Sequence, residues 1–302
     1  MIRALRPAAI PLTRTAFSGI APSSWGQDAM PEHLPADTNL QAKEDPALAP
    51  PPLAFSRAEL NAMRAKLYEA PTMPLDELPP HTCKFDKRMP RDSGVLIPLA
   101  NIGGVAHVIV TLRAAALRVH ASEASFPGGK VEEGDANVVQ TALRETEEEL
   151  SLPMANIEVL GALKPEYSLG NKARVWPVIG FVHPSDAVDA ATDSAISGDA
   201  TARKPLPSLN LSTIHPDPGE VSGIVPLPLS AVADPSRKSA HYFRLDGRRP
   251  YWKFRCGDLI HPPPEEPMPL EVWGLTGWFL TRFAEQMGWG DRPPVSLPPT
   301  DD

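Results

Sequence analysis

Runs of apolar and β-branched residues in the middle of the chain predict the strands of a sheet. Residues 95–97 and 105–112 form two such runs, and the Asn-Ile-Gly-Gly sequence of residues 101–104 supplies the turn of a hairpin between them. Residues 157–163 and 175–182 predict two more strands. The second of these is nearly all apolar, so we expect it to be buried inside the sheet.

Helical periodicity marks three other segments. Ser56 and Glu59 form a capping box that opens a helix reaching to about residue 70. Residues 136–150 predict a second helix, and residues 270–287 predict an amphipathic helix near the end of the chain. The apolar stripe of the first helix consists of Leu60, Met63 and Leu67.

The segment between the last buried strand and the C-terminal elements has a different composition. Residues 184–219 are poor in large apolar side chains, so they cannot offset the entropy of ordering and predict a flexible insertion. Regular structure is expected again at residues 221–229 and in a hairpin formed by residues 241–245 and 251–255.

Proline separates the folded part of the chain from its flanks. Of 37 prolines in 302 residues, 15 precede residue 101 and 17 follow residue 204. Each proline removes a backbone donor and fixes φ, so few are tolerated in a core. We therefore predict a disordered leader and linker in residues 1–55, one folded domain over residues 56–287 and a disordered tail in residues 288–302.

Charge and cysteine content exclude several classes of protein. A net charge of −8 opposes binding to nucleic acid or to a membrane surface, because both need a broad basic face. The two cysteines, Cys83 and Cys256, exclude a disulfide scaffold and a structural zinc site and fit reduced thiols. No stretch approaches the roughly 18 apolar residues of a membrane span.

The segment before Asp28 has the composition of a mitochondrial presequence. It contains Arg3, Arg6 and Arg14 with several Ser and Thr residues and no acidic residue, which favours mitochondrial import over secretion. A disordered tail of a cytoplasmic protein is the alternative. The chain ends in Pro-Thr-Asp-Asp, so the peroxisomal C-terminal tripeptide is not expected.

An acidic run on the second predicted helix carries the chemistry. Glu145, Glu148 and Glu149 stand at positions i, i+3 and i+4, which places their carboxylates on one helix face. Like charges at this spacing repel, and a divalent cation with a preference for oxygen ligands removes the conflict. A solvated acidic surface is the alternative interpretation.

Neighbouring residues favour a metal site over a solvated surface. The opposite stripe of the helix is apolar enough to anchor it on a sheet. Gly128 and Gly129 allow the upstream backbone to turn tightly and approach a ligand. Arg144, the only cation within the acidic helix, is expected to pair with Asp135 and so tie the loop to the helix. The residues of the opposite stripe are Val139, Leu143, Thr146 and Leu150.

The spacing from Gly129 through Arg144-Glu145 to Glu148-Glu149 resembles the Nudix box, G-x5-E-x7-R-E-U-x-E-E-x-G-U with U aliphatic. Four features depart from that pattern. They are Asp135 in place of the first Glu, one additional residue before Arg144, Thr146 in place of an aliphatic residue, and Ser151 in place of the last Gly. Because Gly at that last position caps the helix in the left-handed conformation, Ser151 is expected to weaken the cap by about 1 kcal/mol.

The Asp and the additional residue resemble the coenzyme A (CoA) pyrophosphatase branch of the Nudix hydrolases. That branch has an upstream motif of the form L-L-T-x-R-S-x3-R-x3-G-x3-F-P-G-G. Here Ile109-Val110-Thr111-Leu112-Arg113-Ala114 is followed in register by Arg118, Ser122 and Phe126-Pro127-Gly128-Gly129. Ala114 replaces Ser and Ser122 replaces Gly, and the second replacement bears on substrate preference rather than on hydrolysis.

This resemblance implies an α+β fold of the Nudix type, a mixed sheet sandwiched between helices (α/β/α), over residues 56–287. It implies metal-dependent hydrolysis of the pyrophosphate bond of CoA or acyl-CoA, a small-molecule nucleotide substrate. The products are 3′,5′-ADP and 4′-phosphopantetheine or its acyl form. The alternatives are another nucleoside diphosphate substrate, such as ADP-ribose or an NDP-sugar, or a catalytically silent nucleotide-binding module.

The resemblance also assigns roles to residues. Glu145, Glu148 and Glu149 would hold Mg²⁺ or Mn²⁺, and Arg144 joins them in the catalytic set while pairing with Asp135 as a structural partner. The substrate-binding candidates are Gly128, Gly129 and Lys130 for the phosphate loop and Arg113 and Arg118 for the 3′-phosphate, with His120 as a weaker choice. Glu220 is a possible further carboxylate, and Trp273 and Trp278 are expected either to stack on adenine or to belong to the core.

Overall fold

The computed structural model of the chain describes residues 49–69, 91–118, 120–168, 173–184 and 202–295. The expected presequence, Cys83 and residues 296–302 of the expected tail lie outside the described residues. Within the described helices, none is long and apolar enough to cross a membrane.

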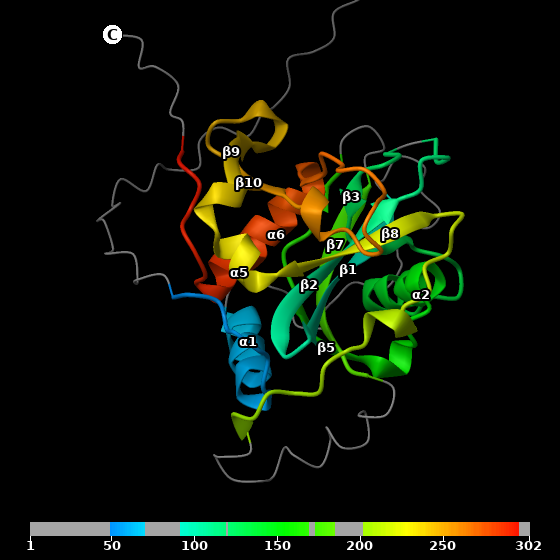
Figure 1. Cartoon of the computed structure of the whole chain (residues 1–302), viewed down its shortest axis with the longest axis horizontal. Coiled ribbons are helices and arrows are strands. Elements are labelled where there is room, and N and C mark those ends of the chain that lie inside the picture. Colours follow the sequence, from blue (N-terminus) through cyan, green and yellow to red (C-terminus); the bar gives the residue numbers. More distant parts are fainter. Residues whose placement is uncertain (1–48, 70–90, 119, 169–172, 185–201, 296–302) are drawn as a thin grey trace, which may run out of the picture. The chain divides into compact units, whose positions relative to one another are not determined.

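Strands make up most of the regular structure between the first and last helices (Figure 1). In chain order the elements are α1 (Arg57–Glu69), β1 (Asp92–Ile102), β2 (Val105–Arg113), β3 (Ala124–Ser125), β4 (Gly128–Lys130), α2 (Val138–Leu150), β5 (Ile157–Ala162), β6 (Glu166–Tyr167), β7 (Arg174–Val182), β8 (Val221–Pro228), α5 (Leu229–Ala233), β9 (Lys238–Tyr242), β10 (Pro250–Arg255), β11 (Glu271–Val272) and α6 (Gly274–Met287).

The main sheet is mixed and is organised around β1. Strand β1 runs antiparallel to β2 and to β4 and parallel to β7. Strands β5 and β6 pair antiparallel with β7, and β3 and β8 pair antiparallel with β2. Strands β9, β10 and β11 form a second, antiparallel sheet. The predicted hairpin is therefore confirmed, with its turn at Gly103 and Gly104.

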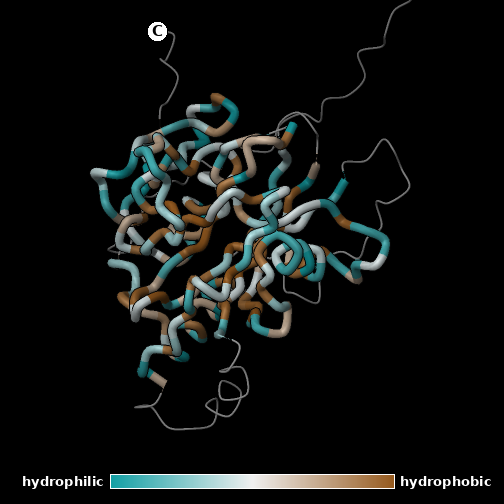
Figure 2. The backbone as a smooth tube through the Cα atoms, turned by 45° about the vertical axis from the view of Figure 1, so that its right-hand side comes forward, coloured by the Kyte–Doolittle hydropathy of each residue, from teal (hydrophilic) through white to brown (hydrophobic). Residues whose placement is uncertain are grey.

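Helices cover both faces of the main sheet. On one face, residues of α1 and α6 such as Leu60 and Phe279 pack with buried residues of the sheet in the larger core. On the other face, Ala142 and Leu150 of α2 pack over Leu96 in a smaller one. Figure 1 shows α2 on one side of the strands and α1 and α6 on the other, and Figure 2 shows hydrophobic residues concentrated between them. The α/β/α arrangement is thus confirmed.

Residues 202–219 correct the expected insertion. Leu209 and Ile214 in this segment are 4% and 6% exposed and join the core on the α2 face. The Leu209 N–H also donates to the carbonyl of Asn101 on β1 (2.7 Å). A few buried apolar side chains are enough to hold the segment because its backbone also hydrogen-bonds to the sheet. The average composition of the segment does not reveal such bonds. Residues 185–201 lie outside the described part of the chain.

The boundaries of the folded domain are also wider than expected. Phe55, placed in the leader, is fully buried, and the Asn101 side chain bonds both its N–H and its carbonyl. Trp289, placed in the tail, is 9% exposed and packs edge-on against Phe283. The expected helix 270–287 begins only at Gly274, because the two residues of β11 pair with β10 instead.

A partly buried ion-pair cluster joins α1 to β5 and to His183, the residue after β7. The Glu158 carboxylate on β5 accepts bonds from Arg57 and Arg64 of α1 and lies 2.6 Å from Nε2 of His183. Burial acts to raise the pKa of Glu158, but these hydrogen bonds and charges outweigh it and hold the pKa at about 2, against an ordinary value of 4.5.

This cluster gives a prediction for acid stability. Because the folded-state pKa of Glu158 is depressed, its contribution to stability is complete above pH 4.5 and is lost as the pH falls toward about 2. The difference in unfolding free energy between wild type and Glu158→Gln is therefore expected to be largest at neutral pH and to shrink over that window. Urea unfolding from pH 7 to pH 2 measures it, with the exposed Glu133→Gln as control. A difference that does not change with pH would contradict the assignment.

Candidate active site

Helix α2 lies directly against the central strand because Gly94 on β1 has no side chain. A Cβ at Gly94 would overlap with the carbonyl oxygen of Val138 in the first turn of α2. The helix begins after Asn137, whose Oδ1 accepts the N–H of Gln140 (3.0 Å) as an N-cap. The residues of α2 are thereby held at a fixed depth over the sheet.

The buried face of α2 differs in part from the expected stripe. Thr146 and Leu150 are fully buried as expected, whereas Val139 and Leu143 are only partly buried. Glu149, which was expected on the outward acidic face, is also buried. The reason is that Gly128 of β4 and the turn at Asp217 both approach Glu149, whereas Glu148 on the same helix stays exposed. The buried residues are Val138, Thr141, Ala142, Thr146, Glu149 and Leu150.

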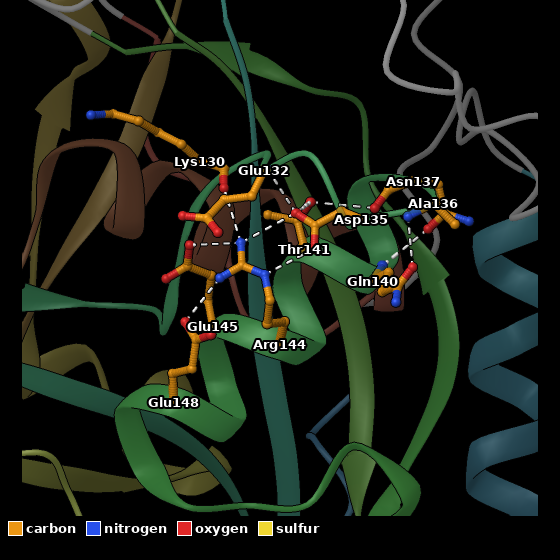
Figure 3. Close-up of polar contacts among 10 residues, drawn as sticks. All are labelled: Lys130, Glu132, Asp135, Ala136, Asn137, Gln140, Thr141, Arg144, Glu145 and Glu148. Atoms are coloured by element: carbon orange, nitrogen blue, oxygen red, sulfur yellow. Dashed lines mark hydrogen bonds and ion pairs between the residues drawn. The ribbon is translucent and has the colours of Figure 1, made fainter. Parts of the chain in front are cut away.

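Arg144 connects the loop before α2 to the carboxylates on the helix (Figure 3). Its Nε and Nη2 donate to the two carboxylate oxygens of Asp135 (2.8 and 3.2 Å), so the expected pair is present. Asp135 also accepts bonds from the Glu132 N–H and the Thr141 hydroxyl. Burial acts to raise the pKa of Asp135, but these bonds outweigh it and the pKa is lowered. Asp135 therefore stays ionised and anchors the guanidinium.

The same guanidinium contacts two of the three glutamates. Nη2 of Arg144 lies 3.1 Å from Glu145 Oε1, and Nη1 donates to Glu148 Oε2 (2.8 Å). Nη2 also donates to the carbonyl of Lys130 on β4 (3.1 Å). Figure 3 shows the Lys130 side chain extending away from these carboxylates. Arg144 thus positions the acidic side chains and the end of β4 together.

Gly128 and Gly129 bring the β4 backbone against the acidic helix. A Cβ at Gly129 would overlap with the carboxylate of Glu145. Gly128 has φ +148°, a conformation that favours glycine, and a Cβ there would overlap with Gly94 and Val95 on β1. The close approach expected from the two glycines is therefore present, and it is directed at Glu145.

This contact gives a prediction for Gly129→Ala. The added methyl group forces the flexible Glu145 side chain to rotate, while the backbone of Gly129 has a negative φ that alanine adopts freely. We expect a loss of about 10²-fold in hydrolysis, the cost of misplacing a catalytic group, with little change in melting temperature. Gly134→Ala, where a Cβ meets open space, is the control. Equal activity in the two variants would remove Glu145 from the site.

Glu149 is the most buried of the three glutamates, with 4% of the residue exposed. Burial raises its pKa to about 8, and the charges of Glu220 and Glu145 act in the same direction. A backbone bond from Gly128 and the charge of Arg113 oppose the increase. Glu149 therefore faces the Gly128 backbone among other acidic groups, and Glu220, a possible site residue by sequence, is close enough to act on it.

The chemistry of this donor set suits a hard divalent cation. Burial raises the pKa of Glu145 as well, and the charges of Glu148 and Glu220 add to the effect. Carboxylate oxygens under mutual repulsion are the ligands that Mg²⁺ and Mn²⁺ prefer. In this arrangement Arg144 is paired with Glu145 and Glu148. Among the described residues, no three acidic, His or Cys side chains therefore lie close enough together to hold an ion.

The upstream arginines differ in their placement. The side-chain Nε of Arg113 is buried without a hydrogen-bond partner in the described part of the chain, and its charge acts on Glu149. Arg118 is exposed, and His120 pairs with Glu123 (2.9 Å) at the surface. The structure therefore brings Arg113 to the acidic cluster and leaves Arg118 on the outer loop.

Two serines occupy backbone conformations that favour glycine. Ser122 and Ser151 have φ +58° and +54° and replace the two glycines of the motif patterns. Ser151 ends α2 in the left-handed conformation, as expected, and its hydroxyl donates to the carbonyl of His215 (2.9 Å). This bond supplements a cap that lacks glycine.

Sequence reasoning missed the contribution of the segment before β8. The N–H groups of His215 and Asp217 donate to the carbonyls of Leu150 and Glu149 (3.1 and 2.9 Å) at the end of α2. The Asp217 carbonyl in turn accepts the N–H of Glu220 (3.0 Å). One short turn therefore caps the acidic helix and places Glu220. The Asp-Pro-Gly sequence at residues 217–219 is the signal for that turn.

The two tryptophans considered for adenine stacking lie in different surroundings. Trp278 stacks on Phe243 (4.8 Å between ring centroids), and the guanidinium groups of Arg249 and Arg282 lie over its ring. It therefore belongs to the packing of α6 against the second sheet, the second of the two expectations. Trp273 precedes α6 and is 44% exposed.

Comparison with known proteins supports the fold and identifies the family. A model of the NUDIX domain matches residues 90–200. Human mitochondrial coenzyme A diphosphatase NUDT8 is 32% identical over 199 residues, covering 66% of this chain and 70% of that protein. Mouse NUDT8 is 30% identical and covers 62% and 73%. The uncharacterized Nudix hydrolase NudL of Citrobacter koseri is 36% identical and covers 66% and 83%.

The fold, the acidic helix with its Gly-Gly loop, and these relatives define a hydrolase of phosphoric anhydride bonds. The chain belongs to the Nudix hydrolase family. Within that family, its similarity to human and mouse NUDT8 supports the coenzyme A pyrophosphatase branch that the upstream motif predicted.

Proposed function

We propose that this protein hydrolyses the pyrophosphate bond of CoA or acyl-CoA to 3′,5′-ADP and 4′-phosphopantetheine or its acyl form. One water oxygen adds to a phosphorus atom, the bridging P–O bond breaks, and both products leave as phosphate monoesters with release of protons. The observation that carries the proposal is the convergence of Glu145 and Glu149 on the Gly128-Gly129 backbone, with the charge of Arg113 acting on Glu149. The register of the upstream motif and the similarity to the coenzyme A diphosphatase NUDT8 favour CoA over other nucleoside diphosphates.

We propose that Mg²⁺ or Mn²⁺ is the cofactor and that Glu145, Glu148 and Glu149 hold it, with Glu220 as a further oxygen donor. When bound, the cation supplies positive charge against both phosphates of the pyrophosphate. Glu148 is 58% exposed, so it is free to turn from Arg144 toward an ion without loss of packing. Arg144 remains anchored on Asp135 and keeps the helix in register with β4.

The loop and the upstream arginine complete the substrate site in this proposal. Gly128 and Gly129 carry no side chains of their own, so a phosphate would be able to approach this backbone beside the Glu145 carboxylate. Arg113 has one buried donor that finds no partner in the described residues, and a phosphate oxygen would satisfy it. Lys130 and Arg118 are exposed, so they are assigned to phosphate oxygens at the outside of the site. Arg118 is assigned to the 3′-phosphate of CoA.

The test is a substrate panel with and without metal. Purified full-length protein is incubated with CoA, an acyl-CoA, ADP-ribose and an NDP-sugar, with Mg²⁺, with Mn²⁺ or with EDTA, and the product masses are recorded. We expect 3′,5′-ADP from CoA only when metal is present. Turnover of ADP-ribose or an NDP-sugar in preference to CoA would show that CoA is not the preferred substrate. Binding of these compounds without turnover of any of them would support a catalytically silent nucleotide-binding module.

A second measurement tests Arg118. Because only CoA carries the 3′-phosphate, Arg118→Ala is expected to raise KM for CoA about tenfold while KM for dephospho-CoA stays close to that of wild type. The exposed Arg248→Ala is the control. Equal effects on both substrates would remove Arg118 from recognition of the 3′-phosphate.

We also propose that the protein acts in mitochondria, on the basis of the arginine-containing N-terminal segment and the similarity to mitochondrial NUDT8. Fusion of residues 1–48 to a fluorescent protein tests this location. Diffuse cytoplasmic fluorescence would contradict it.

A further inference from the structure

A cavity of about 910 Å³ opens beside β3, and none of the acidic residues of α2 lines it. Its walls come from the loop before β3, the turn after α5, the end of β10 and the segment that leads through β11 into α6 (Figure 1). Its volume lies within the range of small-molecule binding sites, roughly 300–1,000 Å³. The proposed function so far assigns no part of the substrate to it.

Arg113 connects this cavity to the acidic cluster. The Arg113 N–H donates to the carbonyl of Glu123 (3.0 Å), and its carbonyl accepts the N–H of Ser122 (3.2 Å), both in the cavity wall. On its other side, the charge of Arg113 acts on Glu149. Glu123 and Gly128 are only five residues apart, so the chain between them spans at most about 18 Å. A flexible ligand with its pyrophosphate at Gly128 can therefore reach the cavity.

The electrostatics of the cavity wall disfavour a phosphate group. The wall carries four carboxylates and two guanidinium groups, so its charge is negative. Arg237 is already engaged by Asp258 through two bonds (2.7 and 2.6 Å), and Arg255 donates to the carbonyl of Ser236. The charged wall residues are Glu123, Asp234, Asp258, Glu271, Arg237 and Arg255. This wall therefore disfavours the phosphorylated nucleotide half of a substrate and suits an uncharged half.

Apolar groups line the side of the cavity near α6. Trp273 is 44% exposed there, which is unusual for the largest side chain in proteins, and Met268 is partly buried beside it. An exposed ring next to a cavity is a ready contact surface for a ligand. The ring, together with the carboxylates and backbone groups of the other walls, suits a flexible ligand in which amide groups alternate with methylene groups.

We propose that this cavity receives the pantetheine arm of the substrate and the first carbons of an attached acyl chain, with Trp273 and Met268 in contact with the arm. This inference rests on the proposed function, because it assumes that the pyrophosphate lies at Gly128 and Gly129. It adds a subsite for the uncharged half of CoA, separate from the arginines assigned to the 3′-phosphate.

The test measures the two halves of the substrate separately. Isothermal titration of the full chain with 4′-phosphopantetheine and with 3′,5′-ADP, in the presence of Mg²⁺, compares wild type with Trp273→Ala, Trp273→Phe and Met268→Ala. We expect Trp273→Ala to weaken binding of 4′-phosphopantetheine about five- to tenfold and to leave binding of 3′,5′-ADP unchanged. Trp273→Phe keeps a ring and is expected to retain most of the affinity. Leu53→Ala, which removes an exposed apolar side chain outside the cavity, is the control.

The outcomes separate this inference from the proposed function. If wild type hydrolyses CoA but the cavity variants bind both halves as wild type does, or lose 3′,5′-ADP instead, the subsite is wrong and the proposed function stands. If wild type does not hydrolyse CoA, the proposed function fails by the substrate panel. Melting curves check the fold, and Met268→Ala provides an independent position in the wall should Trp273→Ala unfold.

Discussion

Replacement of Glu148 by Gln is expected to lower the rate of pyrophosphate hydrolysis by about 10²- to 10³-fold, the usual cost of losing one group that stabilises transition-state charge. Glu148 is 58% exposed, and its one described bond is to Arg144, which keeps its two bonds to Asp135. The substitution therefore removes a charge without removing packing. Steady-state kinetics with saturating Mg²⁺ and a melting curve measure both effects.

Glu147→Gln is the matched control for this prediction. It makes the same chemical change one residue away, and helical spacing puts Glu147, two positions from both Glu145 and Glu149, on a different side of α2 from those two residues. Glu147→Gln is expected to keep near-wild-type turnover. If Glu148→Gln keeps wild-type turnover as well, the carboxylate of Glu148 does not hold the metal ion. If Glu148→Gln loses activity and unfolds together, its role is structural.

Gly94→Ala is expected to lower the free energy of unfolding by about 3 kcal/mol and to reduce activity severely. The Cβ would overlap with the Val138 carbonyl, and because backbone is on both sides, neither partner can move alone. The whole helix must shift away from β1, and the shift carries Glu145 and Glu149 away from the Gly128-Gly129 loop. Urea unfolding and kinetics of the same preparation measure the two effects.

Gly134→Ala is the control for Gly94→Ala, since its Cβ meets open space and its backbone φ is not positive. It is expected to change stability by less than about 0.5 kcal/mol. Gly94→Ala with wild-type stability and activity would show that α2 has freedom to move on the sheet. In that case the helix position would not determine the geometry of the site.

Local patterns predicted most of the elements. The Asn-Ile-Gly-Gly turn and the apolar runs around it correspond to β1 and β2, and the nearly all-apolar run 175–182 corresponds to the buried β7. The Ser56–Glu59 capping box marks the start of α1, where the Ser56 hydroxyl accepts the Glu59 N–H (3.2 Å). Each signal lies within a few residues of the structure it specifies, so no tertiary information was needed.

Contacts between distant segments were not predicted. The burial of Leu209 and Ile214 depends on β1 and α2, which are far away in the sequence. The short strands β3, β4 and β11 are defined by their partners rather than by their own composition. Elements of two or three residues have too little periodicity to be recognised alone.

The sequence by itself determined which residues are proposed to carry the chemistry: the carboxylates of the acidic helix, the Arg144–Asp135 pair and the two glycines in their fixed register. Only the tertiary structure decided how different the three glutamates are. Burial beside Gly128 raises the pKa of Glu149, a guanidinium holds Glu145, and Glu148 remains at the surface. Helical spacing fixes the angle between side chains, whereas their burial depends on what packs against the helix. Here these are β4 and the turn at Asp217, which is far from α2 in the sequence.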